Sequence, residues 1–142
     1  MKIAIGSDHA GYKLKEQVKN YLIKKGHEIK DFGTSTEESC DYPDFAYPVA
    51  LAVAAGKFDR GILLCGSGVG VTIVANKVPG IRAVNAFDLS IAKQSRQHGD
   101  CNVLCLAGGK LKKEKALKIV DVWLKTTFSG EERHLRRIKK IK

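Results

Sequence analysis

The residues best suited to chemistry are a cysteine and three alternate glycines in the segment Cys65-Gly66-Ser67-Gly68-Val69-Gly70. Alternate glycines let the backbone approach a ligand closely and turn several N–H groups toward it. A helix is expected to follow, and its amino end adds positive potential. We interpret this segment as a cradle for an anion or an oxyanion. It is not the dinucleotide fingerprint, because Val71 stands where the third glycine of G-x-G-x-x-G is required.

The position of Cys65 favours a role beyond packing. A thiol beside backbone donors and a helix amino end is stabilised as the thiolate, which can act as a base or a nucleophile. The alternative is that Cys65 is an inert, buried, small apolar side chain. The spacing alone does not decide between these two interpretations.

Three further groups of polar residues are candidates. Asp8 and His9 follow the first expected strand, although Asp8 can also simply cap the next helix. His98 is expected in a loop, where an imidazole exchanges protons near neutral pH. Arg133 and Arg137 share one face if their segment is helical, which suits a phosphate group, or they belong to a solvated basic tail.

The elements that must position these residues follow from the hydrophobic pattern. Short apolar runs predict strands over 2–5, 28–32, 61–64, 81–86 and 102–106, separated by helical patterns. Such alternation predicts one α/β domain over 1–142, a three-layer sandwich with a five-stranded parallel, Rossmann-like sheet and helices on both faces. A basic helix or arm is expected at 131–142. Ligands of such sheets bind at the carboxyl ends of the strands, where Asp8 and Cys65 are expected.

Composition and charge limit the possible partners. The chain has 142 residues, 44% hydrophobic and 28% charged, which excludes a disordered protein. The net charge is +10, and residues 110–142 hold 12 Lys/Arg and 4 Asp/Glu, which favours an anionic partner or a solvated helix face. A nucleic-acid-binding module remains an alternative, although the basic segment lacks interleaved aromatic residues. No apolar run is long enough to span a bilayer, so we expect a cytoplasmic protein without a membrane partner.

The four cysteines do not form a metal-binding pattern. None belongs to a C-x-x-C pair, so zinc-ribbon and thioredoxin sites are not predicted. His98, Cys101 and Cys105 are close in sequence, but an intervening strand would point their side chains in different directions. We therefore expect no metal site and no cofactor.

Taken together, several stretches resemble the ribose-5-phosphate isomerase B family, which includes the galactose-6-phosphate isomerase subunits. The resemblance runs over essentially the whole chain. The matching stretches are IAIGSDHAG (3–11), KGHEIKDFGT (25–34), DYP (41–43), GILLCGSGVG (61–70), NKVPGIRA (76–83), SRQH (95–98) and RHLRR (133–137).

The resemblance implies a metal-free aldose–ketose isomerase that interconverts sugar phosphates through an enediolate. It implies that Cys65 is the base and that His98 is the acid that opens the sugar ring. The implied substrate contacts are Asp8, His9, the cradle residues Gly66, Ser67, Gly68, Val69 and Gly70, and the phosphate ligands Arg133 and Arg137.

Two positions depart from the family pattern. Gly99 stands where asparagine is usual, and Gly109 stands where an arginine usually contacts phosphate, with Lys110 next to it as the available cation. Ribose 5-phosphate is the expected substrate. The alternatives are a six-carbon sugar phosphate, such as allose or galactose 6-phosphate, and a non-catalytic domain that binds a phosphometabolite.

The order of the elements predicts a site shared between subunits. His98 precedes the fifth strand and should lie at the amino edge of the sheet, whereas Cys65 follows the third strand at the carboxyl edge. One subunit would hold them far apart. We therefore expect a homodimer or tetramer in which His98 reaches Cys65 of a partner across a two-fold interface.

Overall fold

Five parallel strands form one sheet in the computed structural model, which describes all residues 1–142. The strand order is β2-β1-β3-β5-β4. The elements are β1 (Lys2–Ser7), α1 (Tyr12–Lys24), β2 (Glu28–Asp31), α2 (Pro43–Ala54), β3 (Arg60–Cys65), α3 (Val69–Asn76), β4 (Ala83–Asn85), α4 (Leu89–Gly99), β5 (Val103–Ala107), α5 (Lys113–Lys125) and α6 (Glu132–Lys139). The predicted three-layer α/β fold is confirmed.

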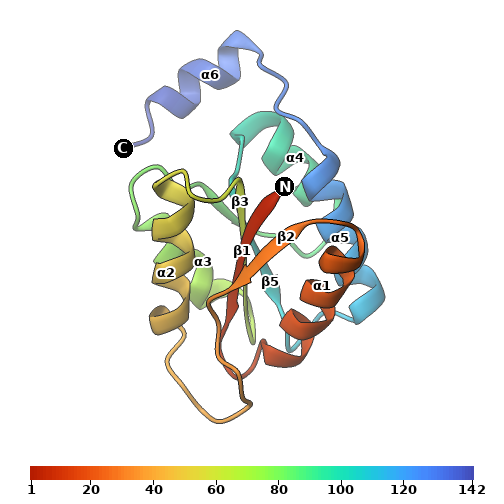
Figure 1. Cartoon of the computed structure of the whole chain (residues 1–142). Coiled ribbons are helices and arrows are strands. Elements are labelled where there is room, and N and C mark those ends of the chain that lie inside the picture. The colour runs from red at the N-terminus through yellow and green to blue at the C-terminus, as the bar shows by residue number, and fades with distance from the viewer.

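The helices cover both faces of the sheet, and the alternation along β3 shows how (Figure 1). Ile62 and Leu64 belong to a core shared with α1, α4 and α5. Leu63 and Cys65 belong to the opposite core, shared with α2 and α3. Because both faces of β1, β3 and β5 are buried, these central strands show continuous apolar runs instead of a period of two, whereas the edge strand β2 alternates between exposed and half-buried residues.

The strand order places the candidate residues at one crevice. β1 and β3 are hydrogen-bonded neighbours, but the helices that follow them, α1 and α3, lie on opposite faces of the sheet. The loops after these two strands therefore diverge, and this is the point at which open α/β sheets bind ligands. Asp8 and Cys65 lie on either side of it.

The fourth strand is shorter than the sequence predicts. β4 covers Ala83–Asn85, where a strand over 81–86 was expected. The Ile81 N–H donates to the Val78 carbonyl at 3.1 Å, and the Arg82 N–H donates to Asn102 Oδ1 at 2.9 Å. These two amides are thus bonded in a turn and to a side chain, so the ladder with β5 begins only at Ala83.

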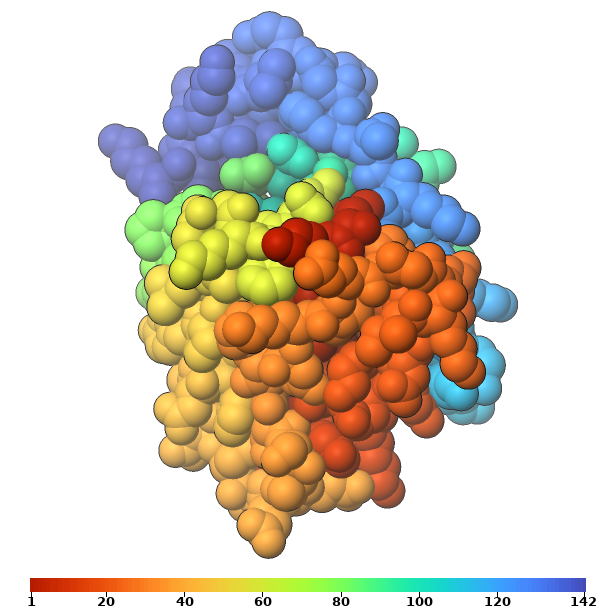
Figure 2. All heavy atoms as spheres, in the orientation of Figure 1, coloured from red at the N-terminus to blue at the C-terminus, as the bar shows by residue number.

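The predicted basic C-terminal segment forms α6, beyond the amino ends of the strands (Figure 1). Figure 2 shows the C-terminal segment as a lobe at that end of the domain. His134 is the one buried residue of this helix. No helix in the chain has the length and apolar character needed to cross a membrane.

Candidate active site

The cradle loop is built around the sulfur of Cys65. The thiol lies at the end of β3 and is only 5% exposed, so it sits below the surface and not openly at the mouth of the strand. The Gly68 N–H donates to Cys65 Sγ at 3.2 Å. The Val69 N–H, at the start of α3, donates to Ser67 Oγ at 3.2 Å. The sulfur therefore receives one donor from the loop that encloses it.

Other amides of this loop and of the first turn of α3 have no acceptor. The N–H groups of Gly66, Ser67, Gly70 and Val71 make no hydrogen bond within the chain. Buried or half-buried amides normally have a partner, so a group of unpaired ones marks a place for an acceptor from outside the chain. Four such donors beside the amino end of a helix are what an oxyanion cradle requires, and the cradle stays a prediction.

Two glycines of the cradle are required by the local geometry. Gly68 has φ 76°, in the left-handed region, and a Cβ there would lie 2.4 Å from Asn85 Oδ1. A Cβ on Gly70 would lie 2.7 Å from the ring of Tyr42. Side chains at these positions would displace Asn85 or Tyr42, so the backbone can take this course only with glycine.

The neighbouring loops hold the cradle through backbone hydrogen bonds. The N–H of Gly108 donates to the Cys65 carbonyl at 2.7 Å, and that of Gly109 donates to the Gly66 carbonyl at 3.0 Å. From the other side, the Asp8 N–H donates to the Leu64 carbonyl at 3.3 Å. Gly109 and Lys110 are exposed at the same edge of the sheet. Direct backbone contact on both sides fixes the cradle before any ligand arrives.

Asp8 and His9 lie beside this loop. Asp8 is buried, and its Oδ1 accepts from the Gly11 N–H at 3.0 Å, in the turn before α1. The alternative that Asp8 caps this helix is wrong, because the N-cap of α1 is Gly11 and no side chain caps the helix. Its second carboxylate oxygen has no partner in the chain. The Cys40 N–H donates to His9 Nδ1 at 3.2 Å, which requires a lone pair on that nitrogen. The ring proton of His9 is therefore on Nε2, where it can serve as a donor.

The remaining candidates form a second cluster at the opposite edge of the sheet. The expectation of a loop at His98 is wrong: His98 belongs to the last turn of α4, because the helix continues to Gly99. It is exposed there and stacks on His134 of α6, with ring centroids 4.2 Å apart and planes at 14°. Arg133 donates to Glu131 at 2.9 Å, and Arg137 is exposed without an ionic partner. Thus the structure brings His98 together with the helix of the two arginines, and not with Cys65 of its own chain.

Burial controls the charge of two groups near these clusters. Burial, followed by the positive charge of His98 and Arg133, lowers the pKa of His134, which favours the neutral ring in the stack. Burial raises the pKa of the Cys105 thiol to about 12, so this cysteine is not a second nucleophile. No three His, Cys, Asp or Glu side chains come together as a metal-binding group.

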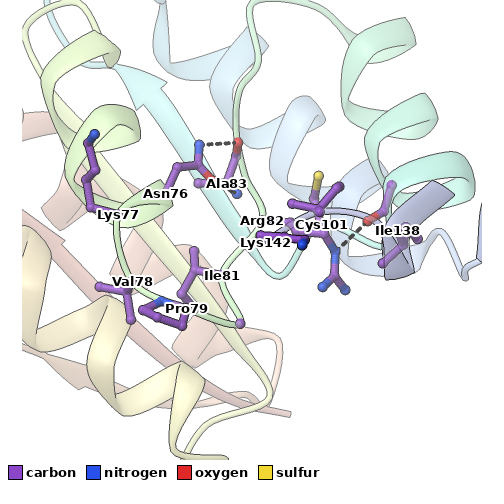
Figure 3. A pocket seen from close by; sticks show the side chains of 13 residues that line it. Asn76, Lys77, Val78, Pro79, Ile81, Arg82, Ala83, Cys101, Ile138 and Lys142 are labelled. Carbon is purple, nitrogen blue, oxygen red and sulfur yellow. Dashed lines mark hydrogen bonds between the residues drawn. The ribbon is translucent and has the colours of Figure 1, made fainter.

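The largest cavity, about 600 Å³, lies at the amino edge of the sheet and not at Cys65. It is bounded by the loop between α3 and β4, by Gly99 and by the end of the chain (Figure 3). Arg82 projects beside it and donates through Nε to the Gly99 carbonyl at 2.8 Å. A Cβ on Gly99 would meet only Cys101 Sγ, at 3.3 Å, so this position has room for a side chain.

Three residues of these clusters were not predicted from the sequence. Asn85 and Tyr42 touch the cradle, and His134 stacks on His98. His134 had a signal, because it lies between Arg133 and Arg137 in RHLRR, and Tyr42 had one, because it belongs to the matching stretch DYP (41–43). Asn85 lies outside these stretches, and no local pattern marks it.

Comparison with known proteins gives consistent matches over the whole chain. Residues 3–141 match the family described as Ribose/Galactose Isomerase. Ribose-5-phosphate isomerase B of Escherichia coli is 47% identical, with 99% of this chain and 93% of that protein aligned. D-erythrulose-4-phosphate isomerase of Pectobacterium atrosepticum is 42% identical, with 92% and 86% aligned.

Solved structures agree closely. Ribose-5-phosphate isomerase B of Clostridium thermocellum has a TM-score of 0.97 at 52% identity, covering 99% of this chain and 95% of that one. The Mycoplasma genitalium enzyme with bound ribulose-5-phosphate has a TM-score of 0.94 at 43% identity, covering 99% and 93%.

Proposed function

We propose that this chain, which belongs to the ribose/galactose isomerase family, interconverts ribose 5-phosphate and ribulose 5-phosphate with Cys65 as the base and His98 of a partner subunit as the ring-opening acid. It is an aldose–ketose isomerase of sugar phosphates. The observation that carries the proposed mechanism is the set of four unpaired amides in the loop after Cys65 and the first turn of α3.

The geometry supports a proton transfer between adjacent carbons. The thiolate of Cys65 removes the proton from C2 of the open-chain aldose, and the electron pair moves to the carbonyl oxygen on C1. The cradle amides stabilise the resulting enediolate, a task for which fixed backbone donors are suited. Return of the proton to C1, with exchange of the hydroxyl proton between O1 and O2, completes the ketose.

The charge distribution supports the placement of the phosphate. The exposed guanidinium groups of Arg133 and Arg137 lie on α6, the helix whose His134 stacks on the imidazole of His98. His98 would protonate the ring oxygen to open the furanose while the arginines hold the phosphate. In one chain these groups face away from Cys65, so the proposal requires a homodimer or a tetramer built from such dimers.

Replacement of the base tests the catalytic assignment. Cys65→Ser should lower kcat for ribose 5-phosphate by about 10²–10⁴-fold, the usual contribution of a positioned general base. Cys101→Ser is the matched control, because Cys101 is a half-buried thiol that lies at the opposite, amino edge of the sheet. Wild-type turnover should survive EDTA. Full activity of Cys65→Ser would remove Cys65 from the mechanism.

Mixed oligomers test the shared site. Cys65→Ala and His98→Asn subunits should each be inactive alone. Random reassembly of equal amounts makes half of the dimers hybrid, each with one intact site, so activity should return to about a quarter of wild type. Two variants that stay inactive after verified mixing would show that each site uses one chain.

Substrate length is part of the proposal, because relatives of similar identity carry names for different sugars. Gly99 lacks the side-chain donor that the family's usual asparagine provides next to His98. Gly109 lacks the usual arginine, so Lys110, the next residue in sequence, is the available cation. A panel of ribose, allose and galactose phosphates, run with Gly99→Asn, tests this point. We expect ribose 5-phosphate to be preferred and Gly99→Asn to lower its KM. Preference for a hexose phosphate would assign the chain to the six-carbon alternative.

A non-catalytic phosphometabolite-binding domain is the alternative that the same panel of sugar phosphates tests. It predicts binding of sugar phosphates without turnover of any of them.

A cytoplasmic location is also part of the proposed function, and the four unpaired cysteines support a reducing compartment.

A further inference from the structure

Asn85 lies at the carboxyl end of β4, beside the cradle but outside every motif of the sequence. It is half-buried, and its Nδ2 donates to the Ser67 carbonyl at 3.1 Å. Its Oδ1 is buried and has no hydrogen-bond partner. A buried amide oxygen without a partner costs free energy, and an apolar side chain of similar size would avoid that cost. The amide therefore serves a purpose other than packing.

The hydrogen bond of Asn85 acts on one peptide group. The carbonyl of the Ser67–Gly68 peptide accepts from Asn85, and the N–H of the same peptide donates to Cys65 Sγ at 3.2 Å. A peptide is planar, so fixing the direction of its carbonyl also fixes the opposite direction of its N–H. Asn85 and Cys65 are thus linked through a single rigid unit.

This peptide is one that can flip. Gly68 has φ 76° and ψ −11°, the values of the third residue of a type II turn. Rotation of the preceding peptide converts a type II turn into a type I turn, and glycine accepts both conformations. A flip would turn the Gly68 N–H away from the sulfur and the Ser67 carbonyl toward it.

We propose that Asn85 is a positioning residue that locks the Ser67–Gly68 peptide with its N–H toward Cys65 and thereby stabilises the thiolate. The inference rests on the proposed function, since it deepens the role of Cys65 as the base. The negative end of a flipped carbonyl would instead repel the thiolate. The bond to Asn85 also polarises the peptide, which strengthens the donor that faces the sulfur.

Variants of Asn85 have a matched control in Asn76. Asn76 ties the other end of α3 to β4 through two bonds with the backbone of Ala83, at 3.0 and 2.8 Å. Both asparagines connect the α3 region to the same strand, but only Asn85 touches the cradle. A purely structural role of Asn85 would make the two sets of variants behave alike.

The experiment measures Cys65 alkylation by iodoacetamide in the full-length oligomer, between about pH 6 and 9, by mass spectrometry of the Cys65 peptide. Asn85→Leu should slow alkylation about threefold to tenfold at neutral pH, the effect of one neutral hydrogen bond on an equilibrium. The profile should move to higher pH. Asn85→Asp should slow it more, because a carboxylate would face the Ser67 carbonyl. Asn76→Leu should leave the profile unchanged.

Activity provides the second measurement. Both Asn85 variants should lower kcat with little change in KM, and Asn85→Asp gives the same comparison if Asn85→Leu fails to fold. An unchanged alkylation profile in a folded Asn85 variant would overturn the inference, and so would an equal change in Asn76→Leu. Alkylation needs no turnover, so an active Cys65→Ser enzyme would refute the base assignment without altering this result.

Discussion

Arg96 is the residue whose replacement most directly tests how the acid end of the site is held. Its guanidinium is 3% exposed and donates to Asp100 Oδ1 at 2.8 Å, to the Cys101 carbonyl at 2.6 Å and to the Thr126 carbonyl at 3.2 Å. It also lies 5.9 Å from the ring centroid of Trp123. One side chain thus joins the end of α4 to the approach to β5 and to the end of α5.

The cost of Arg96→Met follows from the groups left behind. Methionine replaces the stem, but the carbonyls of Cys101 and Thr126 lose a charged donor, at about 1–3 kcal/mol for each group left unpaired. Asp100 is 40% exposed and remains hydrated, so it adds little. We expect unfolding free energy to fall by about 3 kcal/mol. The melting temperature should fall by roughly 6–12 °C for a chain of this size.

The matched control is Arg136→Met. Arg136 pairs with Glu132 at 2.7 Å, as short as the bond of Arg96 to Asp100, but the two side chains are 52% and 78% exposed. An exposed i,i+4 pair contributes about 0.3–0.5 kcal/mol. Urea unfolding at one fixed protomer concentration, followed by circular dichroism and by the fluorescence of Trp123, measures the loss of unfolding free energy in both variants. Equal losses in the two variants would refute the argument from burial.

Three other predictions concern pH and the cradle. Burial raises the pKa of Asp31, but hydrogen bonds from Lys15 and a second lysine lower it by more, so the pKa lies below its usual value of 3.8. The stability that this pair contributes is therefore present above pH 3.8 and is lost as the pH falls below it. Lys15→Met should reduce that loss on the acid side, as measured by urea titrations. Burial and nearby positive charges lower the pKa of His134 below 6.5. The stability that the neutral ring contributes is therefore complete above that pH and falls as the ring is protonated, so His134→Phe should flatten the pH profile of stability between about pH 5 and 7. Gly70→Ala should displace the ring of Tyr42 and lower kcat/KM at least about tenfold, with little change in secondary structure by circular dichroism.

Much of the fold follows from local patterns. Short apolar runs identify the five strands, of which β1, β3 and β5 are buried, and the glycines after β3 identify the candidate cradle, because both depend on residues close in sequence. The order of the strands does not follow from such patterns, since it depends on which faces the helices cover. The short β4 is an example: the amide of Arg82 bonds to the side chain of Asn102, twenty residues away.

In the candidate site too, contacts between residues close in sequence can be predicted, and contacts between distant segments cannot. The loop after Cys65 and the turn that contains Asp8 are local, and the sequence singles out both, although Asp8 bonds within the turn before α1 and does not cap the helix. Asn85 and the stack of His134 on His98 are contacts between distant segments, so spacing contains no information about them. The burial of Cys65 was one of two alternatives that the spacing left open, because it depends on α2 and α3, which pack against the same face as the end of β3.

Three successive residues at the end of α4 hold the C-terminal segment. Arg96 bonds to the carbonyl of Thr126, the Gln97 carbonyl accepts from the Ser129 N–H at 3.1 Å, and His98 stacks on His134. The proposed acid and the proposed phosphate ligands of α6 therefore form one unit within a subunit, while the proposed base belongs to the neighbouring subunit. In such a site, the distance from phosphate to acid is set inside one chain, and the distance from acid to base is set by the interface. Sugar length is then selected by how the two subunits meet, and variants at the interface should change substrate preference more than variants within α6.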